Sequence, residues 1–137
     1  MGGILLISHG RFAEGLKESL EMLCGECPQV FTACLESMDG LEAFSEKFEQ
    51  AYQKASKYGN VAVFCDLMGG TPCNAAVKKL LRKENQSLIA GMNLPMLMSF
   101  IFGDTKKESV ISEGKNAIVD VLENLSMETP DCDEYEE

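Results

Sequence analysis

The chain of 137 residues has no tryptophan, a single histidine and few bases. Its 12 Lys and Arg residues stand against 22 Asp and Glu residues, so the net charge is −10 at pH 7. Nucleic-acid binding depends on Lys and Arg contacts with phosphates, and this balance argues against it. No uncharged apolar stretch approaches the ~20 residues that cross a bilayer, which excludes a spanning helix.

The amino terminus lacks the basic residues and the long apolar segment of a secretory signal. The six cysteines are therefore expected to be reduced thiols of a cytoplasmic protein rather than a disulfide framework. The length fits one domain, which we expect over residues 1–125. Six acids and no base lie from Glu128 onwards, so 126–137 is expected to be an acidic, disordered tail and the rest carries a charge of only −4.

Apolar runs alternate with segments of helical period along the chain. Strand-like runs lie at 3–8, 30–35, 61–65 and 87–90, and helices are predicted at 12–24, 41–55, 75–83 and 95–102, with Asp39 as the cap of the second. This alternation predicts an α/β fold, with an open, mainly parallel four-stranded sheet and helices on both faces. We expect the strand order 2-1-3-4. Residues 110–125 fit a helix, yet 117–122 also has the composition of a strand.

The residues that follow each strand are the first candidates for function, because open α/β sheets bind ligands there. His9 ends the first strand, and imidazole is a nucleophile and proton carrier near neutral pH. Asp66 follows the most apolar strand, where a carboxylate needs a partner. If Asp66 accepts one ring N–H of His9, the other ring nitrogen is free to attack. The alternatives are a surface histidine and a helix-capping aspartate.

The run Gly69-Gly70-Thr71-Pro72 predicts a turn into a helix. Two glycines permit positive φ and expose backbone amides. Thr71 is expected as the cap and Pro72 as the first helical residue, forming an anion site at the helix N-terminus. A plain tight turn is the alternative. Neither a Walker loop nor GxGxxG is present, so no nucleotide cofactor is expected.

Cys24 and Cys27 form a CxxC motif at the carboxyl end of a predicted helix. Redox motifs sit at a helix N-terminus, which lowers the thiol pKa, and zinc would require a second pair. The other cysteines lie apart at 34, 65, 73 and 132, so no metal site is expected, and Cys34 and Cys65 are assigned to the core. A flavodoxin-like or thiol redox protein using Cys24 and Cys27 is kept as an alternative.

Four segments carry a resemblance to a known family. They are Ser8-His9-Gly10; Leu20–Leu23 with Gly25-Glu26; Asp66–Pro72 with Asn74-Ala75-Ala76; and Ile89–Leu97. Over residues 3–103 they resemble the IIA component of the mannose/sorbose-type sugar phosphotransferase system. The resemblance implies that His9 is phosphorylated by the histidine-containing phosphocarrier protein and passes the group to a IIB component. Sugar uptake then proceeds through a membrane complex, so contact with the membrane is only indirect.

The resemblance also implies a hydrogen bond between Asp66 and His9, with the carboxylate accepting. We assign phosphoryl binding to Gly69, Gly70 and Thr71, and a partner-binding rim to Met68, Asn93, Leu94, Pro95 and Met96. Many members of the family have Trp at Met68 and Ser at Thr71. Arg11 has no fixed counterpart and its role is open.

The resemblance further implies an antiparallel fifth strand, here 117–122, exchanged within a homodimer. Open sheet edges are a liability that such an exchange would cover. The IIB component is expected to be a separate chain. A related alternative is the phosphodonor subunit of a dihydroxyacetone kinase, whose loop after the third strand resembles Asp-Leu-Gly-Ser instead of the run seen here. The sequence does not name the sugar.

Overall fold

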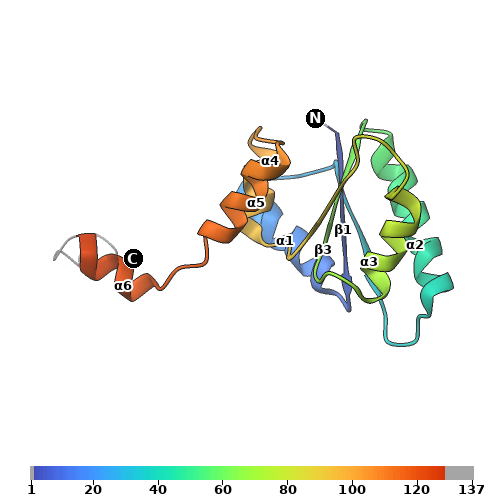
Figure 1. The fold of residues 1–137 in the computed structure, drawn as a ribbon, viewed down its shortest axis with the longest axis horizontal. Helices are drawn as coiled ribbons and strands as arrows, with labels where there is room; N and C mark the ends of the chain where they lie inside the picture. The colour runs from blue at the N-terminus through green and yellow to red at the C-terminus, as the bar shows by residue number, and fades with distance from the viewer. Residues whose placement is uncertain (1, 129–137) are drawn as a thin grey trace.

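The computed structural model describes residues 2–128 (Figure 1). Its strands are β1 (Gly3–His9), β2 (Val30–Leu35), β3 (Val61–Cys65) and β4 (Ser87–Ala90). Its helices are α1 (Phe12–Cys24), α2 (Leu41–Ser56), α3 (Gly70–Leu80), α4 (Leu94–Ile101), α5 (Lys107–Asn116) and α6 (Val121–Glu128). Within the described range, no helix is both long and apolar enough to cross a membrane.

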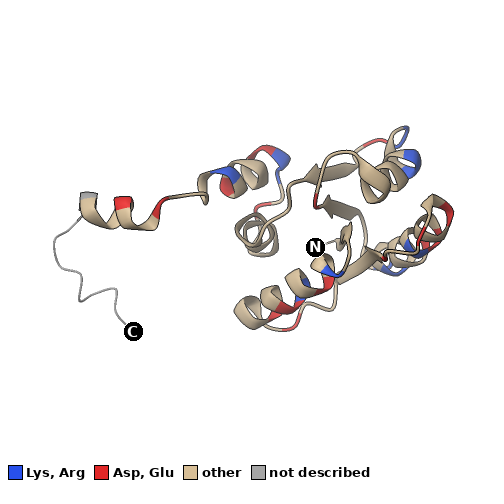
Figure 2. Ribbon diagram, turned by 90° about the horizontal axis from the view of Figure 1, so that it is seen from below, with Lys and Arg blue, Asp and Glu red and all other residues tan. Residues whose placement is uncertain are grey.

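The four strands form one parallel sheet in the order β2-β1-β3-β4. This confirms the predicted fold class and strand order. The strands contain no Lys, Arg, Asp or Glu, and the charged residues lie on the helices and loops (Figure 2). Strands that are covered on both faces must be apolar throughout, which is why their sequences show no alternation.

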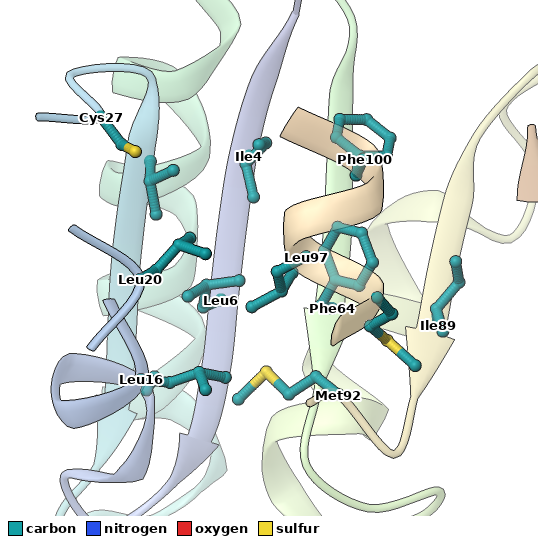
Figure 3. Packing of buried hydrophobic residues seen from close by; sticks show 14 of the residues in the cluster. Ile4, Leu6, Leu16, Leu20, Cys27, Phe64, Ile89, Met92, Leu97 and Phe100 are labelled. Atoms are coloured by element: carbon teal, nitrogen blue, oxygen red, sulfur yellow. The ribbon is translucent and has the colours of Figure 1, made fainter. Parts of the chain in front are cut away.

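Helices cover the two faces of the sheet and create two cores. On one face, α1 and α4 pack on Ile4, Leu6 and Phe64 (Figure 3). On the other face, α2 and α3 pack on Leu5, Ile7 and other residues. Successive β1 side chains point to opposite faces, so one run of four apolar residues supplies both cores. Each fully buried side chain of this size contributes about 1.5–3 kcal/mol.

Two helix starts differ from the prediction. Gly40 rather than Asp39 occupies the cap position of α2. The Asp39 carboxylate instead accepts the Glu36 N–H at 2.9 Å and pairs with Lys47 at 2.6 Å. Helix α3 begins at Gly70 with Gly69 at the cap position, so Thr71 and Pro72 both lie within its first turn. A proline is tolerated there because first-turn N–H groups have no partner within the helix.

The carboxyl-terminal segment also differs. Residues 110–116 lie in α5 and 121–125 in α6, with an irregular segment at 117–120 between them. The strand predicted at 117–122 is therefore not formed. Helix α5 packs against α4, whereas α6 projects from the body (Figure 1). A strand at 117–122 would need the sheet edge of a second chain, so the exchange stays a prediction. The expected tail overlaps α6 at 126–128, and 129–137 lies outside the described residues.

Candidate phosphoryl-transfer site

His9 is the last residue of β1, where it pairs in register with Leu35 of β2. The chain then turns through Gly10 at φ 57°, and the Gly10 N–H donates to the Leu35 carbonyl at 2.8 Å. Glycine adopts this left-handed backbone conformation easily, because it has no Cβ. The imidazole is 43% exposed and can be reached by another protein.

Asp66 follows β3, the neighbour of β1, and its side chain is only 14% exposed. Its Oδ2 accepts the backbone N–H of His9 at 2.9 Å and lies 2.9 Å from Nδ1 of the same residue. Its Oδ1 accepts the Leu67 N–H at 2.9 Å. The hydrogen-bond network therefore assigns a proton to Nδ1, which donates to the carboxylate and leaves Nε2 as the open ring nitrogen.

The environment of Asp66 favours its ionised form. Burial raises the pKa of this carboxyl. The hydrogen bonds from the backbone and ring of His9 and from the Leu67 N–H lower the pKa, and together they outweigh the effect of burial. The net pKa lies below the ordinary value. A carboxylate held in this way orients the ring and stabilises positive charge on it.

Nε2 of His9 lies against the start of α3. A Cβ built on Gly70 would be 3.1 Å from Nε2 and 3.0 Å from Cε1, and Gly70 has φ 78°. Gly69 also has positive φ, at 82°, and Thr71 lies half-buried in the first turn. Unpaired first-turn N–H groups and the positive end of the helix dipole make this an anion site. The structure therefore brings His9, Asp66, Gly69, Gly70 and Thr71 together.

Ser8 is a residue that the sequence reasoning missed. It is 0% exposed and is the one buried polar side chain in the described part of the chain. Its Oγ donates to the Gly10 carbonyl at 3.1 Å and accepts the Ala13 N–H at 2.8 Å. This hydroxyl caps α1, whose cap residue Arg11 forms no side-chain cap. The sequence feature that could have identified Ser8 is a polar residue at the end of an apolar run, directly before the only histidine.

The expected partner rim is only partly at the surface. Met68 is 90% exposed, and Leu94 and Pro95 are half-buried. Met96 is 4% exposed and belongs to the core, so the structure does not support its assignment to the rim. Asn93 caps α4 by accepting the Met96 N–H at 3.1 Å and donates to the Gly114 carbonyl at 3.3 Å. Asn93 and Met96 thus serve packing first.

The surroundings of Cys24 and Cys27 do not favour the redox alternative. Cys27 is buried at the carboxyl end of α1, and burial, followed by nearby Cys24 and Glu21, raises the pKa of its thiol. A reactive thiol requires the opposite shift. Cys34 and Cys65 are buried as predicted, and burial is the main cause that raises the pKa of Cys65 to about 12. Within residues 2–128, no three His, Cys, Asp or Glu side chains are grouped to hold a metal.

Comparison with known proteins decides the family. The model of the mannose-type family EIIA-man, described as PTS system fructose IIA component, matches residues 3–119. The chain belongs to this family. It is 34% identical over 95 residues to the sorbose-specific EIIA component of Lacticaseibacillus casei, covering 69% of this chain and 68% of the relative. It is 31% identical over 101 residues to the fructose-specific EIIA component of Bacillus subtilis, covering 74% and 69%.

Longer relatives and solved structures agree with this family. The chain is 31% identical to the mannose-specific EIIAB component of Escherichia coli K12 over 92% of its own length but only 36% of that protein. The EIIA-man fold is shared with a PTS IIA protein associated with the fucose utilization operon of Streptococcus pneumoniae. That structure superposes with a TM-score of 0.81 at 29% identity, covering 91% of this chain and 99% of the other. This EIIA-man chain is therefore a IIA component of the sugar phosphotransferase system, and the redox alternative is not favoured.

Proposed function

We propose that this IIA component carries a phosphoryl group on Nε2 of His9. The observation that supports this most is the pairing of Nδ1 with Asp66 at 2.9 Å, which leaves Nε2 facing Gly70 and the start of α3. The resemblance of the Ser8-His9-Gly10 and Asp66–Pro72 segments to the family supports the same residue. The group comes from the histidine-containing phosphocarrier protein and goes to a IIB component on a separate chain.

In the first transfer, the lone pair of Nε2 attacks the phosphorus of the donor phosphohistidine. The Nε2–P bond forms while the donor N–P bond breaks, and the electron pair of that bond returns to the donor ring. The His9 ring gains positive charge, which the Asp66 carboxylate stabilises through Nδ1–H. The second transfer reverses these roles, with a nucleophile of the IIB component attacking the same phosphorus.

The start of α3 binds the group between the two transfers. The N–H groups of Gly70 and Thr71 and the Thr71 hydroxyl would donate to the phosphoryl oxygens, and the positive φ of Gly69 and Gly70 supports a turn that exposes these amides. Exposed Met68 contributes to the surface that both partners contact in turn, in the cytoplasm. A homodimer completes the proposal, and the membrane is reached only through the transporter complex.

The test is phosphorylation of purified protein by phosphoenolpyruvate and the general phosphotransferase proteins, read by mass spectrometry. We expect one acid-labile, alkali-stable phosphate on His9, and no phosphate on His9→Ala. Because His9 is exposed, this variant should fold, and circular dichroism checks that. Asn74→Ala, an exposed change on α3, is the matched control and should be phosphorylated normally. Phosphate on Ser, Thr or Asp would contradict the proposal.

A further inference from the structure

The loops at the carboxyl ends of the strands contain one cation. We call residues 9–11, 36–40, 66–69 and 91–93 the phosphoryl face. Arg11 is its only Lys or Arg, and its acids are Glu36, Asp39 and Asp66. A phosphoryl group on His9 would place one to two further negative charges beside ionised Asp66. The other positive features there are the amino-terminal ends of the helices that begin at this face, and among them the start of α3 lies against His9.

The lysine that contacts this face is engaged by its acids. Lys47 of α2 forms ion pairs with Asp39 at 2.6 Å and Glu36 at 3.3 Å, and it donates to the Cys34 carbonyl at 3.3 Å. These contacts neutralise the acids of the β2–α2 loop and hold the ammonium group there. No charged residue lies in 91–93. Arg11 is thus the side chain with which this face can balance a phosphoryl group.

Arg11 lies within reach of His9. Two peptide units separate the Cα atoms, which places them at most about 7.6 Å apart, comparable with the length of an extended arginine side chain. The Arg11 side chain is 81% exposed, and its guanidinium donates to Glu14 Oε2 at 2.9 Å. Exposed pairs at this spacing are weak, so the guanidinium can exchange partners. The Ser8 hydroxyl fixes the backbone at Gly10 and Ala13 on either side of Arg11.

We propose that Arg11 is a further catalytic residue, whose guanidinium leaves Glu14 and binds the phosphoryl oxygens on His9. This rests on the proposed function of His9. The planar guanidinium offers paired N–H donors that match a phosphoryl group, and a phosphoryl group competes well with one exposed carboxylate. Glu14 holds the guanidinium in the unphosphorylated protein and receives it again after the group has been transferred.

Four single variants of the full chain test this, namely Arg11→Ala, Arg11→Lys, Glu14→Gln and, as control, Lys17→Ala, together with the double variant of Arg11→Ala and Glu14→Gln. Lys17→Ala removes a charge of the same sign from α1, three residues beyond Glu14. Each protein is phosphorylated with phosphoramidate, a small phosphoryl donor that needs no carrier, and the phosphohistidine is titrated by ³¹P NMR. Transfer from the carrier is then timed in a second assay.

Arg11 favours the dianion, so Arg11→Ala should raise the pKa of the phosphoryl group and slow carrier-dependent transfer at least about tenfold. We expect a smaller effect on rate than removal of an arginine finger has in a closed site, because Arg11 is exposed to solvent. Arg11→Lys should recover only part of both effects. Glu14→Gln should lower the phosphoryl pKa, and much less so when combined with Arg11→Ala. Lys17→Ala should leave the titration unchanged.

The outcomes separate this proposal from the function of His9. If Arg11→Ala titrates and transfers like Lys17→Ala, Arg11 does not touch the phosphoryl group and the proposal is wrong. If the carrier fails to phosphorylate the wild type but phosphoramidate succeeds, the proposed function fails, and the titration still decides the role of Arg11. If phosphoramidate does not label His9, both proposals are overturned.

Discussion

At the scale of single residues, the site depends on the two oxygens of one carboxylate. Asp66 Oδ2 receives both the backbone N–H and the ring nitrogen of His9, and Oδ1 receives the Leu67 N–H. One side chain therefore fixes the end of β1, the ring orientation and the start of its own loop. The Asp66 carboxylate thus both orients the His9 ring and supplies a negative charge next to it. Substitution by asparagine removes the charge and keeps a side chain that can form hydrogen bonds.

Asp66→Asn should slow phosphoryl transfer while the protein stays folded. An amide still forms hydrogen bonds, but it carries no charge to stabilise the ring cation and it can select the wrong tautomer. By analogy with orienting carboxylates, the barrier should rise by a few kcal/mol, on the order of a hundredfold in rate. Rapid-quench assays measure it. Asp104→Asn, an exposed change in the loop after α4 and outside the strand-end loops, is the control, and unchanged rates in Asp66→Asn would make Asp66 merely structural.

Gly70→Val should impair phosphoryl acceptance more than stability. Valine resists φ 78°, and its Cβ would lie 3.1 Å from Nε2, where phosphoryl oxygens approach. Gly25→Val is a matched control, because Gly25 has φ 83° and no neighbouring atom within 4 Å of the added Cβ. Both variants should lose about 1–3 kcal/mol of folding stability from backbone strain. Only Gly70→Val should lose phosphorylation of His9, measured by mass spectrometry. A normal rate of phosphorylation in Gly70→Val would show that the phosphoryl group binds elsewhere.

At the scale of elements, the turn from β1 into α1 depends on a residue inside the strand. Ser8 caps α1 from within β1, so strand end, turn and helix start form one unit around His9. The turn is therefore defined by a buried hydroxyl rather than by residues of the turn itself.

Ser8→Ala should lower folding stability by about 0.5–2 kcal/mol, since it leaves the Ala13 N–H without its partner. Urea unfolding measures the loss, and amide exchange should increase in the first turn of α1 and not in α2. Ser45→Ala, on α2 and only half-exposed, is the control and should change stability little. Unchanged exchange in α1 would show that the hydroxyl does not hold the turn.

At the scale of the whole molecule, the carboxyl-terminal segment stands apart from the body. Ile118, Val119, Val121 and Leu122 are all exposed. Apolar side chains gathered in this way indicate a contact with another surface. The predicted exchange with a second chain would bury them and cover an open sheet edge.

Truncation after Lys115 should therefore cause dissociation of a homodimer or aggregation. Analytical ultracentrifugation of the full and the truncated chain, each over a range of concentrations, measures it. Truncation after Glu128 is the control and should leave the oligomeric state unchanged. A Lys115 truncation that stays soluble with the oligomeric state of the full chain would refute the exchange.

Acid should destabilise the molecule through its hydrogen-bonded carboxylates. The pKa of Asp39 is lowered first by Lys47, that of Glu49 first by Lys79, and that of Asp66 by His9 and Leu67 against burial. Because these pKa values are lower when folded, the unfolded chain binds more protons in acid. Their contribution is complete above about pH 5 and is lost as the pH falls through the folded pKa values. Urea unfolding from pH 7 to 3 should show a fall in the free energy of unfolding, and this fall should be smaller in Asp66→Asn. The same dependence on pH in both proteins would contradict the contribution of Asp66.

Much of the fold followed from local patterns. The bounds of β2, β3, β4 and α1 were predicted to the residue, because apolar runs and helical periods are local properties with clear ends. The start of α3 was placed too late, and its cap was assigned to Thr71 rather than Gly69. Gly69 and Gly70 both have positive φ, at 82° and 78°, and a helix start of this kind contributes no apolar residues to a helical period.

The sequence by itself determined the α/β class and the candidate residues His9 and Asp66, because apolar runs alternate with helical periods and the polar residues after those runs must lie at one edge of a parallel sheet. Only the tertiary structure decided that one carboxylate holds His9 at both N–H and ring, that Ser8 is buried as a cap, and that Met96 packs inward. These contacts join residues distant along the chain or depend on which face a side chain occupies. They are therefore set by the packing of β1 against β3 and of α4 against the sheet.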